Sequence, residues 1–268
     1  MKILKVYQAY FSPTGRTERI VKGIGKAFSD YPTADIDLTS YETRQKEHSF
    51  KENDLVIIGA PVYGGRLPAA VTKALELFHG INTPVIVVVS YGNNVVGDAL
   101  LELKKCMADK GFTVTGAGYF SAQHTYLKEL GQYRPDVEDM AEIEAFGQQA
   151  RKTLKLLVHY DIQLLGIPGQ YPYEKPPMGA LPFSVATNET CFYCNLCVDR
   201  CPVKAISTDN PKEIDGDVCI RCGACIQICP AQAKFFSGDA YGGLQKKLSA
   251  NVGVRKENWC EMADRKKC

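Results

Sequence analysis

Residues 191–230 read CFYCNLCVDRCPVKAISTDNPKEIDGDVCIRCGACIQICP and contain one spacing of cysteines twice. Each copy is C-x2-C-x2-C-x3-C-P, and every cysteine of the second copy lies 28 positions after its counterpart. Ala205 and Ala233 keep the same offset, which predicts a duplicated half-domain. Three thiolates at this spacing wrap one face of an iron–sulfur cubane, whereas the fourth cysteine ligates the cluster of the other copy.

The spacing therefore predicts two [4Fe–4S] clusters that exchange their fourth ligands. One cluster is assigned to Cys191, Cys194, Cys197 and Cys229, and the other to Cys219, Cys222, Cys225 and Cys201. Structural zinc prefers C-x2-C pairs separated by a longer arm. Disulfides require an oxidising compartment, and cysteines this close in sequence strain the bridge. Zinc and disulfides remain as the less favoured alternatives.

Length and composition place the chain among ordinary globular proteins. Its 268 residues favour two domains, and it is 45% hydrophobic and 23% charged with a formal net charge of +2. No run of eighteen apolar residues exists, so no membrane span is expected. The first eleven residues predict a strand rather than a signal peptide. We therefore expect a cytoplasmic protein, in which thiols stay reduced, and nothing in the composition indicates nucleic-acid binding.

The first 160 residues alternate predicted strands with predicted helices. Strands are expected at 3–11, 34–38, 54–60, 84–90 and 112–120, and helices at 16–29, 68–79, 97–110 and from Pro135 onward. The last helix has an apolar stripe of Val137, Met140, Ile143, Phe146, Ala150, Leu154 and Leu157. This alternation predicts an α/β fold with a doubly wound, five-stranded parallel sheet. The cysteine-rich part is expected to be a small α+β domain of the ferredoxin-like kind.

The predicted organisation has four parts. Residues 1–160 form the sheet domain, 161–183 a linker rich in proline, 184–237 the cysteine-rich domain and 238–268 a basic tail. The linker is either a semi-rigid spacer or a segment that fixes the second domain against the first. The tail is expected to be solvated. Outside the two motifs, Cys106 is predicted to be a small core residue, and Cys260 and Cys268 to be free thiols.

Ligands of open parallel sheets bind beyond the carboxyl ends of the strands. After the first strand, hydroxyl side chains and a glycine precede a helix, which is typical of an anion pocket. The residues concerned are Ser12, Thr14, Gly15, Arg16 and Thr17. The chain has no G-x-x-x-x-G-K-[ST] motif, so a nucleoside triphosphate is disfavoured. An ordinary capped turn is the alternative.

Two further loops come from the same predicted edge of the sheet. The loop after the third strand contains two glycines, which allow close approach to a flat ring, and a tyrosine that offers a stacking face. Its residues are Pro61, Val62, Tyr63, Gly64 and Gly65. The loop after the fourth strand offers amides and side chains for the pyrimidine edge of a flavin, from Ser90, Tyr91, Gly92 and Asn93. Each loop alone is also compatible with a surface turn, but together they predict a flavin site.

These motifs carry a resemblance to a known family. The first loop is similar to the phosphate loop of flavodoxins, and the whole chain resembles the flavodoxin–ferredoxin fusion proteins called EFR-family ferrodoxins. The matching stretches are FSPTGRT (11–17), VIIGAPVYGGRLP (56–68), YGNNVVGDALLEL (91–103), QYPYEKPPMGALPF (170–183) and both cysteine motifs. The resemblance implies a non-covalent FMN in the first domain and two [4Fe–4S] clusters in the second.

One loop departs from the family pattern. The family commonly has Y-G-N-R-x-Y in the third loop, whereas this chain has Asn94 and Val96 at the Arg and Tyr positions. The second stacking face of the flavin is therefore in doubt, and Tyr91 is the candidate to replace it.

The combined cofactors favour an electron-transfer protein. A flavin takes two electrons together or singly, whereas a cubane passes one, so the pair couples one-electron and two-electron steps with an external redox partner. The alternative is an FMN-dependent reductase of a small substrate that the clusters supply with electrons. For this enzyme His124 is a candidate substrate contact, although a structural or solvated loop histidine is favoured. Arg66 either holds an anionic substrate or lies on the surface, and the surface role is favoured. No catalytic residue is predicted, and a scaffold without bound flavin is a third possibility.

Overall fold

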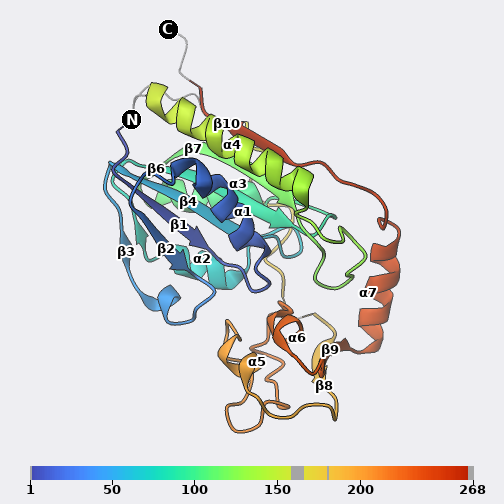
Figure 1. Cartoon of the computed structure of the whole chain (residues 1–268). Helices are drawn as coiled ribbons and strands as arrows, with labels where there is room; N and C mark the ends of the chain where they lie inside the picture. Colours follow the sequence, from blue (N-terminus) through green and yellow to red (C-terminus); the bar gives the residue numbers. More distant parts are fainter. Residues whose placement is uncertain (1, 158–165, 180, 265–268) are drawn as a thin grey trace.

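The computed structural model describes residues 2–157, 166–179 and 181–264, and it contains the predicted parallel sheet. The five parallel strands are β1 (Lys5–Tyr10), β2 (Thr33–Asp37), β4 (Asp54–Pro61), β6 (Thr83–Tyr91) and β7 (Phe112–Ser121). They lie in the order β2-β1-β4-β6-β7 (Figure 1). Counted along the chain this order is 2-1-3-4-5, one of the common doubly wound arrangements, so the predicted fold class is confirmed.

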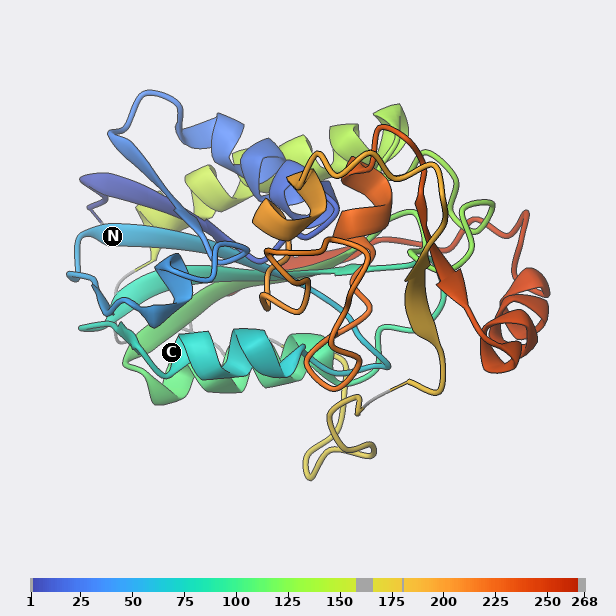
Figure 2. The ribbon, with the colours of Figure 1, turned by 90° about the horizontal axis from the view of Figure 1, so that it is seen from below.

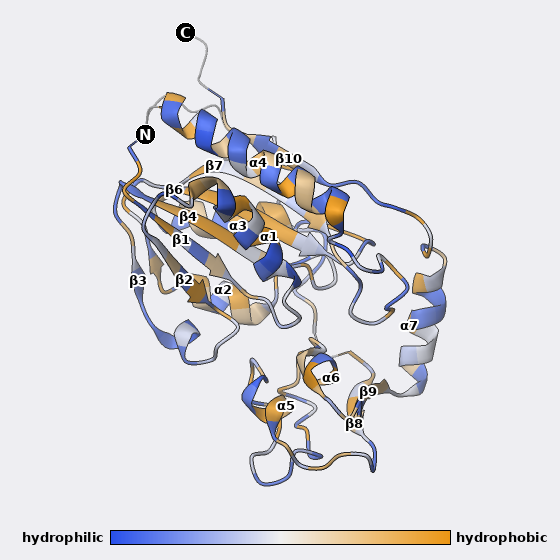
Figure 3. Cartoon of the chain, viewed as in Figure 1, coloured by the Kyte–Doolittle hydropathy of each residue, from blue (hydrophilic) through white to orange (hydrophobic). Residues whose placement is uncertain are grey.

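Helices cover both faces of the sheet (Figure 2). The helices α1 (Arg16–Gly25, continued by the 3₁₀ turn η1, Lys26–Phe28) and α4 (Val137–Leu156) pack on one face, and α2 (Ala69–Leu75) and α3 (Ala99–Asp109) pack on the other. Both faces of β4 and β6 are covered, which is why these strands are continuous apolar runs. In Figure 3 the central strands of the sheet are largely hydrophobic, and α4 alternates between hydrophilic and hydrophobic residues along its length.

Two helix predictions differ from the structure. The helix expected at 68–79 ends at Leu75, because Phe78–His79 (β5) pairs with His48–Ser49 (β3), which follows the short turn η2 (Thr43–Gln45). Phe78 on β5 is fully buried. Val137 was expected to face the core, but it is 84% exposed. The interior side of this first turn of α4 is taken instead by Asp139, which is fully buried.

The tail is folded, and the prediction of a solvated tail is wrong. It contains α7 (Asp239–Ser249) and then β10 (Trp259–Met262), which pairs antiparallel with β7 and adds a sixth strand to the sheet. Trp259 stacks on Tyr119 with ring centroids 5.7 Å apart, and Met262 is buried in the core. The tail thus covers the edge of β7, which would otherwise leave unpaired backbone groups at the end of the sheet. Cys268 lies outside the described residues, whereas Cys260 is on β10 and unpaired.

The cysteine-rich segment forms a smaller unit with β8 (Ser184–Thr187) antiparallel to β9 (Lys234–Ser237) and two short helices, α5 (Leu196–Asp199) and α6 (Ala224–Ile228). Left-handed backbone conformations recur at the 28-residue offset of the motifs. The three pairs are Tyr193 with Arg221, Asn195 with Gly223, and Lys204 with Gln232, with φ between 50° and 76°. The backbone therefore repeats together with the cysteines, as expected for a duplication.

An aromatic cluster joins the two units. Tyr126, from the loop after β7, packs edge-on against Phe183 and Phe236 at centroid distances of 5.2 and 5.1 Å. The hydroxyl of Tyr241 on α7 donates to the carbonyl of Tyr126 at 2.9 Å. On the other side of the cysteine-rich unit, Arg44 donates to the carbonyl of Pro202. The second unit is thus attached to the first on both sides.

The proline-rich linker also contacts the sheet domain. The Asp98 carboxylate accepts the backbone N–H groups of Gln170 at 3.0 Å and Glu174 at 3.1 Å. Of the two readings of the linker, these contacts support the one in which it fixes the position of the second domain. Residues 161–165 and 180 of the linker lie outside the described residues.

Arg66 holds this linker and is neither an anion-binding nor a surface residue. Its side chain is buried, and its Nε and Nη2 donate to the Glu102 carboxylate at 2.9 and 2.6 Å. The guanidinium also lies 4.0 Å from the centroid of the Tyr173 ring and donates to the carbonyl of Lys175. The earlier expectations for Arg66 are therefore wrong, because a buried carboxylate on α3 pairs with it.

Candidate functional site

The carboxyl end of the parallel sheet contains a cavity of about 650 Å³. Three of the loops around it are the three predicted from the sequence, and a fourth follows β7. The linker and the cysteine-rich unit also reach it. Its lining consists of Pro13, Thr14, Arg16, Thr17, Pro61, Val62, Tyr63, Gly64, Ser90, Tyr91, Gly92, Ala122, Gln123, His124, Thr125, Tyr126, Met178 and Arg221.

The first loop leads into the N-terminus of α1. Gly15 precedes the helix with a φ of 77°, and Thr14, Arg16 and Thr17 line the cavity. The predicted residue Ser12 lies behind them, where its Oγ accepts the N–H of Glu18 at 2.9 Å and its own N–H donates to Thr39 Oγ1. Ser12 therefore stabilises the first turn of the helix, whose leading N–H groups have no intrahelical partner and favour an anion.

The second loop is a tight turn beside the cavity. Backbone hydrogen bonds join Tyr63 and Arg66 at 2.9 and 3.1 Å, with Gly64 and Gly65 between them at φ values of 62° and 89°. Two consecutive left-handed residues are the requirement of this turn type, which explains the glycine pair. Tyr63 and Gly64 line the cavity, whereas Gly65 packs behind against Gly97. Burial and the neighbouring Cys222 thiol raise the pKa of the Tyr63 hydroxyl well above its usual value.

The third loop differs from the prediction in two side chains. The ring of Tyr91 is buried edge-on against Tyr119 at 5.7 Å, and its hydroxyl donates to the carbonyl of Glu257 at 2.6 Å. Tyr91 is therefore not available to replace the missing second stacking face. Asn93 does not line the cavity, because its side chain is used in a network with the tail. Ser90, Tyr91 and Gly92 do line it.

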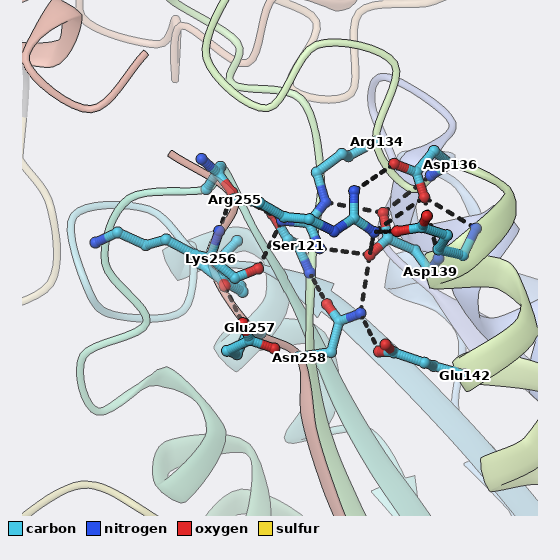
Figure 4. A network of polar contacts seen from close by, with 12 residues as sticks. Ser121, Arg134, Asp136, Asp139, Glu142, Arg255, Lys256, Glu257 and Asn258 are labelled. Atoms are coloured by element: carbon cyan, nitrogen blue, oxygen red, sulfur yellow. Dashed lines mark hydrogen bonds and ion pairs between the residues drawn. The ribbon is translucent and has the colours of Figure 1, made fainter. Parts of the chain in front are cut away.

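That network fixes the third loop to the tail (Figure 4). Asn93 Oδ1 accepts hydrogen bonds from Ser121 and Arg134, and its Nδ2 donates to the carbonyl of Val254 at 2.7 Å. Arg134 forms a buried ion pair with Asp139, and Arg255 and Asn258 of the tail also contact this carboxylate. Next to Asn93, Lys256 Nζ donates to the carbonyl of Asn94 at 2.6 Å. The chain thus supports this loop with residues 250–258, which no local pattern in the sequence predicts.

The fourth loop, residues 122–126, was identified from the sequence only through His124. A Cβ atom on Gly92 would lie 2.6 Å from His124 Cδ2, so the ring packs directly on the third loop. His124 Nδ1 accepts the N–H of Tyr126 at 3.1 Å, which places the proton of the neutral ring on Nε2. Burial lowers the pKa of His124 to about 4, so the imidazole is neutral at pH 7.

The eight cysteines gather into two groups. Cys191, Cys194, Cys197 and Cys229 line one cavity of about 320 Å³, and Cys201, Cys219, Cys222 and Cys225 line a second of the same size. This is the division predicted from the exchanged fourth ligands. In each copy the alanine four residues after the last cysteine donates its N–H to that sulfur, at 3.3 Å for Ala205 to Cys201 and 3.2 Å for Ala233 to Cys229. The repeated alanines are thus placed by hydrogen bonds to cysteine sulfurs.

The geometry of these groups suits a cubane better than a single ion. Within the described ranges, no three His, Cys, Asp or Glu side chains converge closely enough to hold one metal ion. Four thiols that line one cavity instead match the ligand set of an iron–sulfur cluster. The cysteines named in these two cavities are all unpaired.

The two groups differ in their surroundings. We call the first group the outer site, because Cys194 is exposed and its neighbours Phe192 and Tyr193 are 62% and 53% exposed. We call the second group the inner site, because Cys222 and Cys225 are buried and Arg221 lines both this cavity and the cavity of the sheet domain. Phe192 and Ile228 are both exposed large hydrophobic residues in this unit.

Comparison with known families matches two parts of the chain. A flavodoxin domain model matches residues 8–79, and a 4Fe–4S dicluster domain model matches residues 184–230. Among solved structures, the chain is similar to a flavodoxin from the domain Archaea, with 15% identity over 56% of this chain and 99% of that chain and a TM-score of 0.42. It is also similar to oxidised flavodoxin 1 from Bacillus cereus, with 18% identity over 55% and 97% and a TM-score of 0.42. No curated protein matches the chain.

In the part of the chain that the structure describes, no helix is long and apolar enough to cross a membrane. A flavodoxin domain implies FMN, and the C-terminal domain implies 4Fe–4S chemistry in electron transfer. Both domain types occur in the order that the sequence predicts. The chain is therefore a fusion of an N-terminal flavodoxin domain with a C-terminal 4Fe–4S dicluster domain.

Proposed function

We propose that this protein passes electrons between two [4Fe–4S] clusters and a non-covalent FMN, and so couples one-electron to two-electron steps. The observation that carries the proposal is the position of Arg221, which lines the inner cysteine cavity and the flavodoxin cavity together. The two cofactor sites are thus neighbours within one chain. When bound, a flavin accepts two electrons, either together or as two single electrons from a cluster.

The flavodoxin cavity fits an FMN. Its lining combines apolar and aromatic side chains with a few hydroxyl, guanidinium and amide groups, as small-molecule sites commonly do. Thr14, Arg16 and Thr17 at the start of α1 are the residues that would hold the phosphate. Tyr63, Gly64 and Gly92 would hold the ring, because all three line the cavity. The predicted ligands Ser12, Gly15, Gly65 and Asn93 would act from behind the cavity by fixing these loops.

The eight cysteines would hold the two clusters in the sets assigned from the sequence. The exposed Cys194 places the outer site where an external redox protein can approach. The inner site shares Arg221 with the flavodoxin cavity, whereas the residues that line the outer site do not line that cavity. Electrons would therefore enter or leave through the outer site, in a direction that the potentials decide. The proposal keeps the domain bounds 1–160, 161–183, 184–237 and 238–268. It also includes a cytoplasmic location, in which thiols stay reduced.

Anaerobic purification followed by cofactor analysis tests the proposal. We expect about eight iron atoms, about eight sulfides and about one FMN per chain, because each cluster contains four irons. Thr14→Ala combined with Thr17→Ala should lower the FMN content and leave iron unchanged. Cys194→Ser should lower iron by up to about half and leave FMN unchanged. Full clusters with no FMN would exclude the proposal.

A second candidate function, reduction of a small substrate at the flavin, is favoured by one observation. A groove of about 1530 Å³ between the flavodoxin and cysteine-rich units shares Arg16, Gln123, His124 and Tyr126 with the flavin cavity, and it is open to solvent. A substrate in this groove would take two electrons from the flavin, which the clusters would replace one at a time. Turnover of a quinone with a chemical reductant, lost in His124→Ala with FMN retained, would favour this function.

A further inference from the structure

Arg221 is buried at the junction of the two cofactor sites. It lies between Cys219 and Cys222 in sequence, and its side chain is 8% exposed. Nε donates to the carbonyl of Phe183 at 3.0 Å, and Nη1 donates to the carbonyl of Cys219 at 2.5 Å. These two contacts hold the guanidinium in place, and the side chain lines both the flavin cavity and the inner cysteine cavity.

The charge of Arg221 has no carboxylate partner among the residues that the structure describes. Other buried arginines differ in this respect. Arg66 and Arg134 each form an ion pair with a buried carboxylate. Arg44 also lacks one, but it donates to several backbone carbonyls and lines neither cavity. Burying a charge without a counter-charge is unfavourable, and an anion in either of the two cavities that Arg221 lines would offset this cost.

The duplication shows that this arginine is particular to the inner site. The residue 28 positions earlier is Tyr193, which has the same left-handed backbone conformation between two cysteines. Tyr193 is 53% exposed beside the outer site. The two copies therefore share a backbone and differ in this side chain, and the arginine is in the copy that faces the flavodoxin domain.

We propose that Arg221 is a counter-charge shared by the inner cluster and the flavin ring, and that it favours the reduced, negatively charged form of the ring. This inference rests on the proposed function. The cluster with its four thiolates is an anion, and a flavin that has taken two electrons carries negative charge at N1 near neutral pH. A fixed cation beside both groups stabilises their electron-rich forms without any movement of the protein.

The test compares FMN binding before and after reduction in the full chain with its clusters loaded. Arg221→Gln removes the charge, Arg221→Lys keeps it, and Lys246→Gln removes one exposed charge from α7 as a control. The Kd of oxidised FMN is measured by flavin fluorescence, and the potential of bound flavin by titration against reference dyes. In Arg221→Gln we expect the ratio of reduced to oxidised Kd to rise at least tenfold, which corresponds to about 30 mV for a two-electron couple.

The two other variants decide whether charge is the cause. Arg221→Lys should stay within about threefold of the wild-type ratio, which is under half a unit in log K, and Lys246→Gln should not change it. An unchanged ratio in Arg221→Gln, or an equal change in Arg221→Lys, would overturn the inference. If Arg221→Gln does not assemble its clusters, the Arg221→Lys ratio alone decides, since a tenfold change there shows that charge is not sufficient. Absence of FMN binding in the wild type would instead remove the proposed function itself.

Discussion

Replacement of Asn93 distinguishes the role that the sequence predicts for this side chain from the role that it has in the structure. The sequence predicts that this residue binds the flavin, whereas the structure uses its side chain to attach the third loop to the tail. Asn93 is 1% exposed, and Oδ1 accepts from Ser121 Oγ at 3.0 Å, Arg134 Nη1 at 2.8 Å and Lys256 N at 3.2 Å. Nδ2 donates to the carbonyl of Val254 at 2.7 Å.

Asn93→Ala removes these four hydrogen bonds at once. Arg134 keeps its contacts with Asp139 and the carbonyl of Lys256, so it retains partners. The Ser121 hydroxyl, the Val254 carbonyl and the Lys256 N–H each lose the partner that Asn93 supplied. A buried polar group without a partner costs about 1 to 3 kcal/mol, and neighbouring groups relax in part. We therefore expect the tail to be destabilised by about 3 to 5 kcal/mol.

Hydrogen exchange of the flavin-free chain measures the destabilisation at the tail itself. Amides of β10 and of the paired edge of β7 should exchange at least a hundredfold faster in Asn93→Ala, because local opening follows the lost free energy. Asn94→Ala is the matched control. Among the described residues its side chain accepts one hydrogen bond, from Asn251 at 3.3 Å, so we expect a change below about 1 kcal/mol. Unchanged exchange in Asn93→Ala together with weaker FMN binding would show that the sequence prediction was right.

Three further perturbations test other parts of the structure. Burial lowers the pKa of His124 to about 4, so the unfolded chain binds a proton on this residue at a higher pH than the folded chain does. The free energy of unfolding should therefore fall by up to about 3 kcal/mol as the pH decreases from about 6.5 to 4. His124→Gln should remove this part of the pH dependence in urea titrations. Glu102→Gln should lower the free energy of unfolding by about 3 to 5 kcal/mol, because it leaves the buried Arg66 charge uncompensated. The double replacement Arg66→Met with Glu102→Leu should lower the free energy of unfolding by less than Glu102→Gln does. An equal decrease in the two variants would argue against the ion pair as the cause. Lys234 is 3% exposed, lines the outer cavity and donates to Thr187 and the carbonyl of Pro211. Lys234→Met should lower cluster potentials by about 60 mV, which is a tenfold change in the equilibrium constant for one electron. The matched control Lys247→Met, which removes an exposed charge, should leave the potentials unchanged in the same potentiometric titrations.

The parts of the site that the sequence predicted depend on local patterns. Cysteine spacing is local, and it sufficed to divide the eight residues into the two groups that line separate cavities. Buried strands are also local signals, because β4 and β6 are continuous apolar runs. The loops after those strands followed from the topology, since parallel strands bring their carboxyl ends to one edge.

The parts that were missed depend on residues far apart in sequence. Tyr91 and Asn93 resemble ligands in their own loop, but the carbonyls of Glu257 and Val254, more than 160 residues later, take their side-chain donors. From the sequence Arg66 is interpreted as a surface or anion-binding residue, because the sequence does not show that Glu102 pairs with it. The tail shows little apolar periodicity, so its pairing with β7 was not predictable from pattern alone. Each of these predictions was wrong because a residue distant in sequence contacts the side chain and gives it a different role.

The two chain connections between the domains end on the loops that surround the flavin cavity. The linker is held by Arg66 in the second loop and by Asp98 just after the third. The returning tail is held by Tyr91 and Asn93 in the third loop. Since the loops that shape the flavin cavity are also the anchors of the cysteine-rich unit, that unit cannot shift without disturbing the cavity. The fusion therefore does more than tether two domains at high local concentration, because it fixes the inner site against the flavin cavity by the same contacts that form the cavity.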